Sequence, residues 1–90
     1  MERKNICLGS IDEVESKEIE PIVERISGLE ELLLIVEDES LALKINEELT
    51  ELNKYRLEWW QRIVKSHGWN VDTNINWSVD YQDNKIWIIS

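Results

Sequence analysis

Close groups of acidic residues are the side chains in this sequence best placed to do chemistry. Carboxylates come together in Glu37-Asp38-Glu39, in Glu47-Glu48 and in Glu30-Glu31, where they could bind a cation, transfer protons or pair with Arg and Lys. Nineteen acidic residues produce such neighbours by chance, and adjacent residues on a helix diverge by about 100°. The first group also lacks the spacing and the glycine of an EF-hand loop. We therefore expect a solvated or protein-binding acidic surface, with no metal site and no cofactor.

Other reactive residue types are too sparse to predict catalysis. His67 is the only histidine and Cys7 the only cysteine, and nothing else supports a nucleophile–base pair. The three glycines do not form a phosphate-binding loop. A single cysteine allows no disulfide within the chain, which is typical of a reducing cytoplasm. We expect a cytoplasmic protein that is not an enzyme and has no catalytic residues.

Charge is distributed unevenly along the 90 residues, whose formal net charge is −9. Residues 12–58 contain fifteen acidic and five basic residues, whereas residues 59–90 contain three of each and all five tryptophans. Such an acidic chain is a poor ligand for nucleic acid or an anionic membrane, because both require clusters of Lys and Arg. The longest apolar run, residues 32–36, is too short to cross a bilayer. A basic protein surface is the expected partner, although acidity also serves solubility.

The elements that position these charges are mainly helical. Ser10 and Glu13 have the spacing of a capping box, which predicts a helix from about Ile11. Pro21 favours a break, with a second helix starting there, over a kink in one helix. Residues 32–45 fit either a helix or a β-hairpin, and leucine and glutamate propensities favour the helix.

A long helix over residues 40–67 is the best-supported element. Gly68 follows His67 in the pattern of a left-handed helix stop. The apolar seam of this helix recurs at intervals of three and four residues and is interrupted by Arg56, which predicts packing against another helix or self-association. Its apolar members are Ile45, Leu49, Leu52, Trp59 and Ile63.

A C-terminal antiparallel hairpin over residues 76–89 is expected from alternating apolar residues around Asp83-Asn84. A two-residue turn there would place Tyr81 opposite Ile86. An isolated hairpin is marginally stable, so residues 4–8 are a candidate third strand. Trp87 points away from the apolar face of the hairpin and is therefore the leading exposed interface residue.

Together these features predict a single small domain over residues 1–90, of α+β class and predominantly helical, with two or three helices. In size, acidity and layout the chain resembles the small accessory proteins carried by phages and mobile elements, although no motif of a known family covers it. The favoured function is a non-catalytic inhibitor or adaptor that mimics nucleic acid and binds a basic surface of a nucleic-acid-handling protein. The alternatives are a self-associating structural subunit, for example a homodimer, and a small enzyme or ligand-binding module. The candidate partner-binding residues are Glu37, Asp38, Glu39, Glu47, Glu48, Glu51, Glu58 and Trp87.

Overall fold

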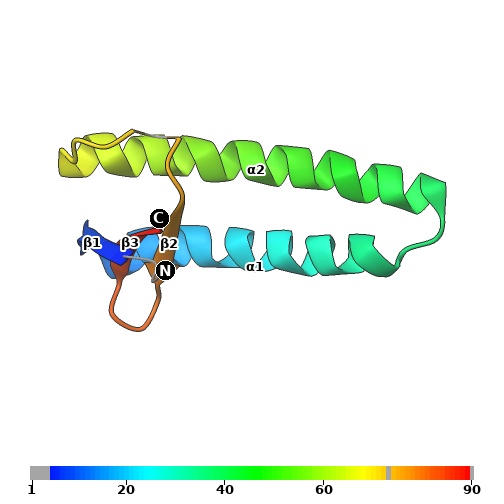
Figure 1. Cartoon of the computed structure of the whole chain (residues 1–90), viewed down its shortest axis with the longest axis horizontal. Helices are drawn as coiled ribbons and strands as arrows, with labels where there is room; N and C mark the ends of the chain where they lie inside the picture. Colours follow the sequence, from blue (N-terminus) through cyan, green and yellow to red (C-terminus); the bar gives the residue numbers. More distant parts are fainter. Residues whose placement is uncertain (1–4, 73, 90) are drawn as a thin grey trace.

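A computed structural model describes residues 5–72 and 74–89 of the chain. Within them it has two antiparallel helices joined at one end, and an antiparallel sheet of order β1-β3-β2 lies at the other end (Figure 1). The predicted predominantly helical α+β fold is confirmed. The N-terminal third strand is also confirmed, although Lys4 lies outside the described residues. The elements are β1 (Asn5–Ser10), α1 (Glu13–Ile35), α2 (Glu39–His67), β2 (Trp77–Asp80) and β3 (Lys85–Ile89).

Helix α1 begins two residues later than the sequence pattern indicated. Asp12, not Ser10, is the N-cap: its carboxylate accepts the backbone N–H of Glu15 at 2.7 Å, and the Glu15 carboxylate accepts that of Asp12 at 2.9 Å. The predicted Ser10–Glu13 box is wrong because Ser10 still pairs with Lys85 in the sheet. Strand pairing therefore keeps the chain extended past the first possible cap.

The predicted break at Pro21 is also wrong, because α1 continues through this residue. Proline removes one helical donor, which normally costs about 3 kcal/mol. Ile19 and Ile26, on either side of Pro21, are 0% and 7% exposed and face the core along one stripe. Apolar burial of about 1.5–3 kcal/mol for each such side chain offsets the lost hydrogen bond.

Residues 32–45 form the helical connection, not a β-hairpin. Helix α1 ends where the backbone N–H of Val36 donates to the carbonyl of Leu32, and α2 begins where the Asp38 carboxylate accepts two backbone N–H groups. The intervening residues 36–38 form a tight loop. Because this loop is short, the two helices must run antiparallel.

The seam of α2 is buried within the chain. Ile45 and Leu49 form a buried cluster with Ile26 and Leu29 of α1, and Leu52 packs beside it. Trp59 and Ile63 lie in a second cluster that includes residues of α1 and the sheet. The residues predicted to support self-association are thus covered by this chain's own helix and sheet.

Trp77 connects the sheet to α2. Its ring stacks on those of Trp60 and Trp59, with centroids 4.8 and 5.5 Å apart. The guanidinium of Arg56 lies 4.4 Å from the Trp77 ring centroid, so the charged residue in the seam makes a cation–π contact within the fold. Trp59 and Trp60 are both buried, and both stack on the Trp77 ring of the sheet.

The hairpin register differs by two residues from the predicted one. Val79 pairs with Ile86, and the connection is a four-residue turn over residues 81–84. The Asp80 carboxylate accepts the backbone N–H groups of Gln82 and Asp83, and Asn84 adopts a φ of 54°. These local interactions favour the longer turn over the two-residue Asp83-Asn84 turn. A two-residue shift keeps each side chain on its expected face of the sheet.

The helix stop at Gly68 is confirmed by its φ of 69° and by the Trp69 N–H, which donates to the Val64 carbonyl at 3.0 Å. Trp69 then folds back toward β1. A Cβ placed on Gly9 would lie 2.7 Å from the Trp69 ring. Glycine is therefore required at residue 9 for close approach of the indole.

Replacement of Gly9 by alanine is expected to destabilise the protein by about 1–3 kcal/mol, because the new methyl group must displace Trp69. Gly28→Ala is the matched control. Gly28 lies inside α1 with nothing within 4 Å of the added Cβ, so alanine should stabilise the protein by up to about 1 kcal/mol. Thermal unfolding followed by circular dichroism should show shifts of opposite sign. Equal shifts of the melting temperature in the two variants would show that packing of the Trp69 ring does not require glycine at residue 9.

Candidate functional site

The acidic residues predicted to bind a partner are all exposed, but two of them have structural roles. Asp38 caps α2, and Glu48 forms a two-point ion pair with Arg25 of α1 at 2.9 and 3.2 Å. The others make no ion pair within the described part of the chain. They are Glu37 in the loop, Glu39 at the start of α2, and Glu47, Glu51 and Glu58 along α2.

Helix α2 as a whole has no excess of negative charge. It contains five acidic and five basic residues. Lys44, Lys54 and Lys65 follow its outer side at intervals that place them among Glu47, Glu51 and Glu58. A partner meeting this side would encounter both signs of charge.

The excess of negative charge lies on α1, which contains seven acidic and two basic residues. Glu13 pairs with Lys17 at 3.0 Å, Glu18 with Arg62 at 2.8 Å, and Glu15 contacts His67. The remaining four glutamates make no ion pair within the described residues, and we call them the α1 acidic row: Glu20, Glu24 and Glu31 on the outward face of the helix, and Glu30, turned about 100° from Glu31. The sequence prediction noted the Glu30-Glu31 pair but did not include this row among the partner-binding residues, although a charge count for each helix would have found it.

The negative charges of this row affect the pKa of Tyr81, which lies at the sheet end of the molecule. Burial raises the pKa of its hydroxyl, and the negative charges of Glu20 and Glu24 raise it further, while Arg56 opposes them. Both causes disfavour the charged phenolate. The negative potential of α1 therefore extends to the turn between β2 and β3.

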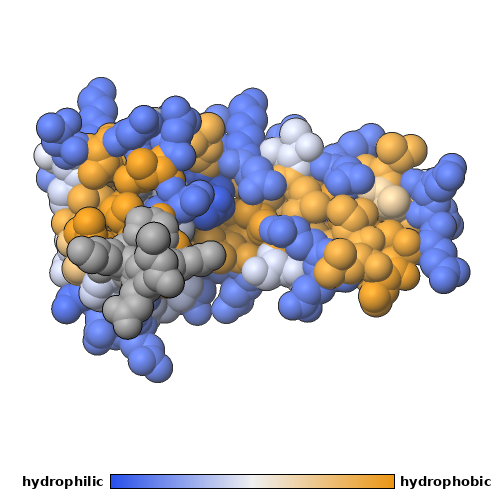
Figure 2. Space-filling view, viewed as in Figure 1, coloured by the Kyte–Doolittle hydropathy of each residue, from blue (hydrophilic) through white to orange (hydrophobic). Residues whose placement is uncertain are grey.

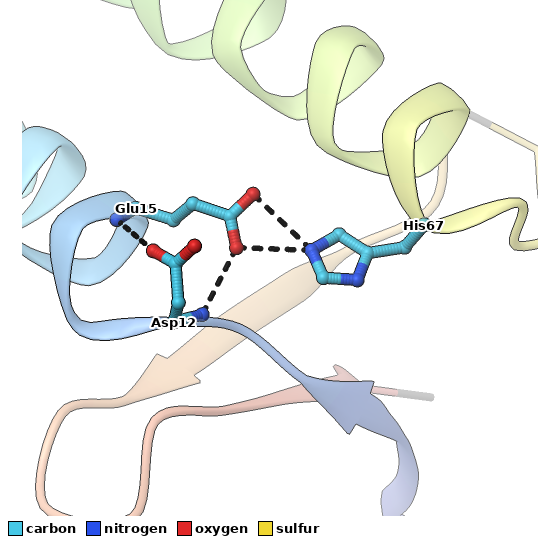
Figure 3. Close-up of polar contacts among 3 residues, drawn as sticks. All are labelled: Asp12, Glu15 and His67. Atoms are coloured by element: carbon cyan, nitrogen blue, oxygen red, sulfur yellow. Dashed lines mark hydrogen bonds and ion pairs between the residues drawn. The ribbon is translucent and has the colours of Figure 1, made fainter.

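His67 joins the end of α2 to the start of α1 (Figure 3). Its Nε2 lies 3.0 and 3.2 Å from the two carboxylate oxygens of Glu15, which also accepts the backbone N–H of Asp12. The Glu15 side chain is only 16% exposed. This arrangement fits a histidine that holds two helix ends together. Within the described residues, no group of three His, Cys, Asp or Glu side chains could hold a metal ion.

Trp87 lies on the outer face of the sheet and is half-buried. With Ser78, Val79, Asp80 and Ile89 it lines a shallow hollow of about 320 Å³. The hollow combines an indole face with one carboxylate. Trp87 thus remains within reach of a partner, at the end of the molecule opposite the helix-connecting loop.

No helix among the described residues combines the length and apolar character needed to cross a membrane. Comparison of the chain with protein-family models, with curated proteins and with solved structures finds no match.

Proposed function

We propose that this protein is a non-catalytic cytoplasmic binding module that uses the α1 acidic row and Glu37 against a basic surface of a nucleic-acid-handling protein. The observation that carries the proposal is the excess of five negative charges on α1, four of them on glutamates that make no ion pair within the described residues. From Glu20 to Glu31 the row is about 16 Å long, since a helix rises 1.5 Å per residue. Carboxylates spaced along such a row can pair with Arg and Lys side chains that otherwise bind phosphate.

The alternative of a self-associating subunit has lost most of the residues first assigned to it. The seam residues are covered by this chain's own helix and sheet, and only Trp87 remains reachable. An acidic chain also repels its own copies. The structure thus gives the binding module a stronger physical basis than the homodimer.

Reversal of charge on α1 is expected to abolish partner binding. The test compares Glu24→Lys/Glu31→Lys with Glu47→Lys/Glu51→Lys, which makes the same charge change at exposed residues of α2. Affinity capture from host-cell extract, with identification by mass spectrometry, should recover a nucleic-acid-handling protein with the unmodified chain and with the α2 variant only. Each exposed substitution should change stability by less than about 0.5 kcal/mol.

The captured complex should also dissociate as salt rises, because exposed charges are screened over about 10 Å at 0.1 M and 3 Å at 1 M. An added oligonucleotide should compete with the protein for the partner. Binding that survives both the α1 reversal and high salt would contradict the electrostatic proposal. Loss of binding in the α2 variant alone would show that the partner contacts Glu47 and Glu51 of α2 and not the α1 acidic row.

A further inference from the structure

Large apolar side chains are exposed at the end of the helical hairpin farthest from the sheet. Figure 2 shows hydrophobic side chains gathered there, beside the loop that joins α1 to α2. We call this set the hairpin tip, and its members are Leu32 (40% exposed), Leu34 (85%), Ile35 (75%), Leu41 (42%) and Leu43 (64%). Exposed apolar patches of this kind on a small protein mark interaction surfaces.

The core beneath the hairpin tip is complete without these residues. Ile26, Leu29, Ile45 and Leu49 are 9% exposed or less, and Leu33 and Val36 pack against them. The fold therefore gains little from leucine at the exposed positions, where a polar residue would be more soluble.

Ion pairs between the helices show on which side each tip residue lies. Two ion pairs, Arg25–Glu48 and Glu18–Arg62, join α1 to α2, and each of their four residues immediately precedes a buried residue. Residues that precede buried positions therefore lie on one common side of the helical hairpin, which we call the ion-pair side. Leu32 lies seven residues after Arg25 and Leu41 seven residues before Glu48, so each lies two helical turns from this ion pair on the same face of its helix. They belong to the ion-pair side by helix geometry.

Residues that immediately follow inward-facing residues lie on the opposite side of the helical hairpin. At the end of the hairpin away from the tip, the sheet covers this side, which we call the sheet side. Trp60 follows Trp59 and stacks on Trp77 of β2. Leu34 and Leu43 are the two most exposed leucines of the tip. Leu34 follows the inward-facing Leu33, and Leu43 lies three residues before Asn46, which follows the buried Ile45, so both lie on this sheet side. Their neighbours toward the sheet that also follow buried positions include the uncharged Ser27, Asn46 and Thr50 and one carboxylate, that of Glu30, which follows Leu29. The apolar face of a partner can cover these uncharged side chains, and a Lys or Arg of the partner can pair with Glu30.

The rim of the hairpin tip determines what can approach it. Residues 30–44 contain five acidic residues and one basic residue. A second copy of the tip, or an anionic lipid surface, would bring like charges together. A partner with Lys and Arg beside its apolar residues would instead satisfy both the leucines and the rim.

We infer that Leu34 and Leu43 anchor a basic amphipathic helix of another protein, which lies along the sheet side of the hairpin tip with its Lys and Arg residues against the acidic rim. Helices commonly bind in this way, with apolar anchors in a groove and charged residues at its edges. The inference rests on the proposed function and names the partner's form. It adds an apolar contact that electrostatics alone does not require.

The test measures binding of two fluorescent peptides by anisotropy. One has Leu at helical spacing among Lys residues, and the other has every Leu replaced by Ala at the same charge and length. Leu34→Ser/Leu43→Ser should weaken binding of the leucine peptide at least about tenfold, as expected for loss of leucine burial. It should leave binding of the alanine peptide unchanged. Leu32→Ser/Leu41→Ser, on the ion-pair side, is the matched control and should change neither affinity.

Several results would overturn the inference. Equal affinity of the two peptides for the unmodified chain would remove the apolar contact but leave the proposed function standing, whereas failure of both peptides to bind would count against both. Concentration-dependent mass in sedimentation, or binding to phosphatidylcholine vesicles, that disappears in Leu34→Ser/Leu43→Ser would assign the tip to a second copy or to lipid. Unchanged circular dichroism melting of the variants confirms that the fold is retained.

Discussion

Truncation of the chain after Asn76 is expected to abolish cooperative unfolding. The cut removes β2 and β3, including Trp77 and the fully buried Ile86. Strand β3 is the central strand, so β1 loses its only pairing partner within the described sheet. Trp59 and Trp60 lose the ring on which they stack and become exposed.

The remaining helices have too little shared core to fold together stably. Their own buried cluster contains only Ile26, Leu29, Ile45 and Leu49, and α1 has an excess of five negative charges. Four such side chains contribute about 6–12 kcal/mol of apolar burial, against roughly 1–2 kcal/mol of backbone entropy for each ordered residue. Circular dichroism should show helix signal that declines gradually with temperature. A sharp transition at the melting temperature of the full chain would contradict this expectation.

Local chemistry predicted the parts of the fold in which neighbouring residues settle the outcome. Gly68 ends α2 as expected because a left-handed residue is required there and few neighbours compete for the position. Gly9 shows the opposite case. Its contact with Trp69 joins residues far apart in the sequence, and no local pattern indicates it.

Two of the wrong predictions share one cause, which is that contacts between elements outweighed a local rule. Ser10 is an acceptable helix cap, but its pairing with Lys85 extends β1. Pro21 is a helix breaker, but burial of Ile19 and Ile26 holds α1 continuous across it. In both places the competing interaction is with residues distant in the sequence, namely Lys85 for Ser10 and the buried residues of α2 for Ile19 and Ile26.

The candidate site was predicted only as a net charge. The sequence shows that residues 12–58 are acidic, but the division between the helices appears only when their boundary is placed at residues 36–38. Glu48 looked as available as Glu47 until its ion pair with Arg25 was known. The packing of α1 against α2 therefore determines which carboxylates make an ion pair within the described residues and which do not.

Replacement of Trp77 by alanine is expected to destabilise the protein by about 3–5 kcal/mol, a large part of the roughly 5–13 kcal/mol that a domain of this size provides. Trp77 is 8% exposed and contacts Trp59, Trp60 and Arg56 at once. Aromatic pairs contribute about 0.5–1.5 kcal/mol beyond their buried area, and the cation–π contact about as much again. Urea unfolding at equilibrium should show a much lower midpoint.

Trp87→Ala is the matched control, because it removes the same side chain from the opposite face of the same sheet. Trp87 is half-buried over a shallow hollow and stacks on no other ring within the described residues. Its loss should therefore cost about 1 kcal/mol, near the centre of the distribution for single substitutions. Equal losses in the two variants would show that the outer face contributes as much to folding as the inner one. A small loss for Trp87→Ala would leave its indole free to serve a partner.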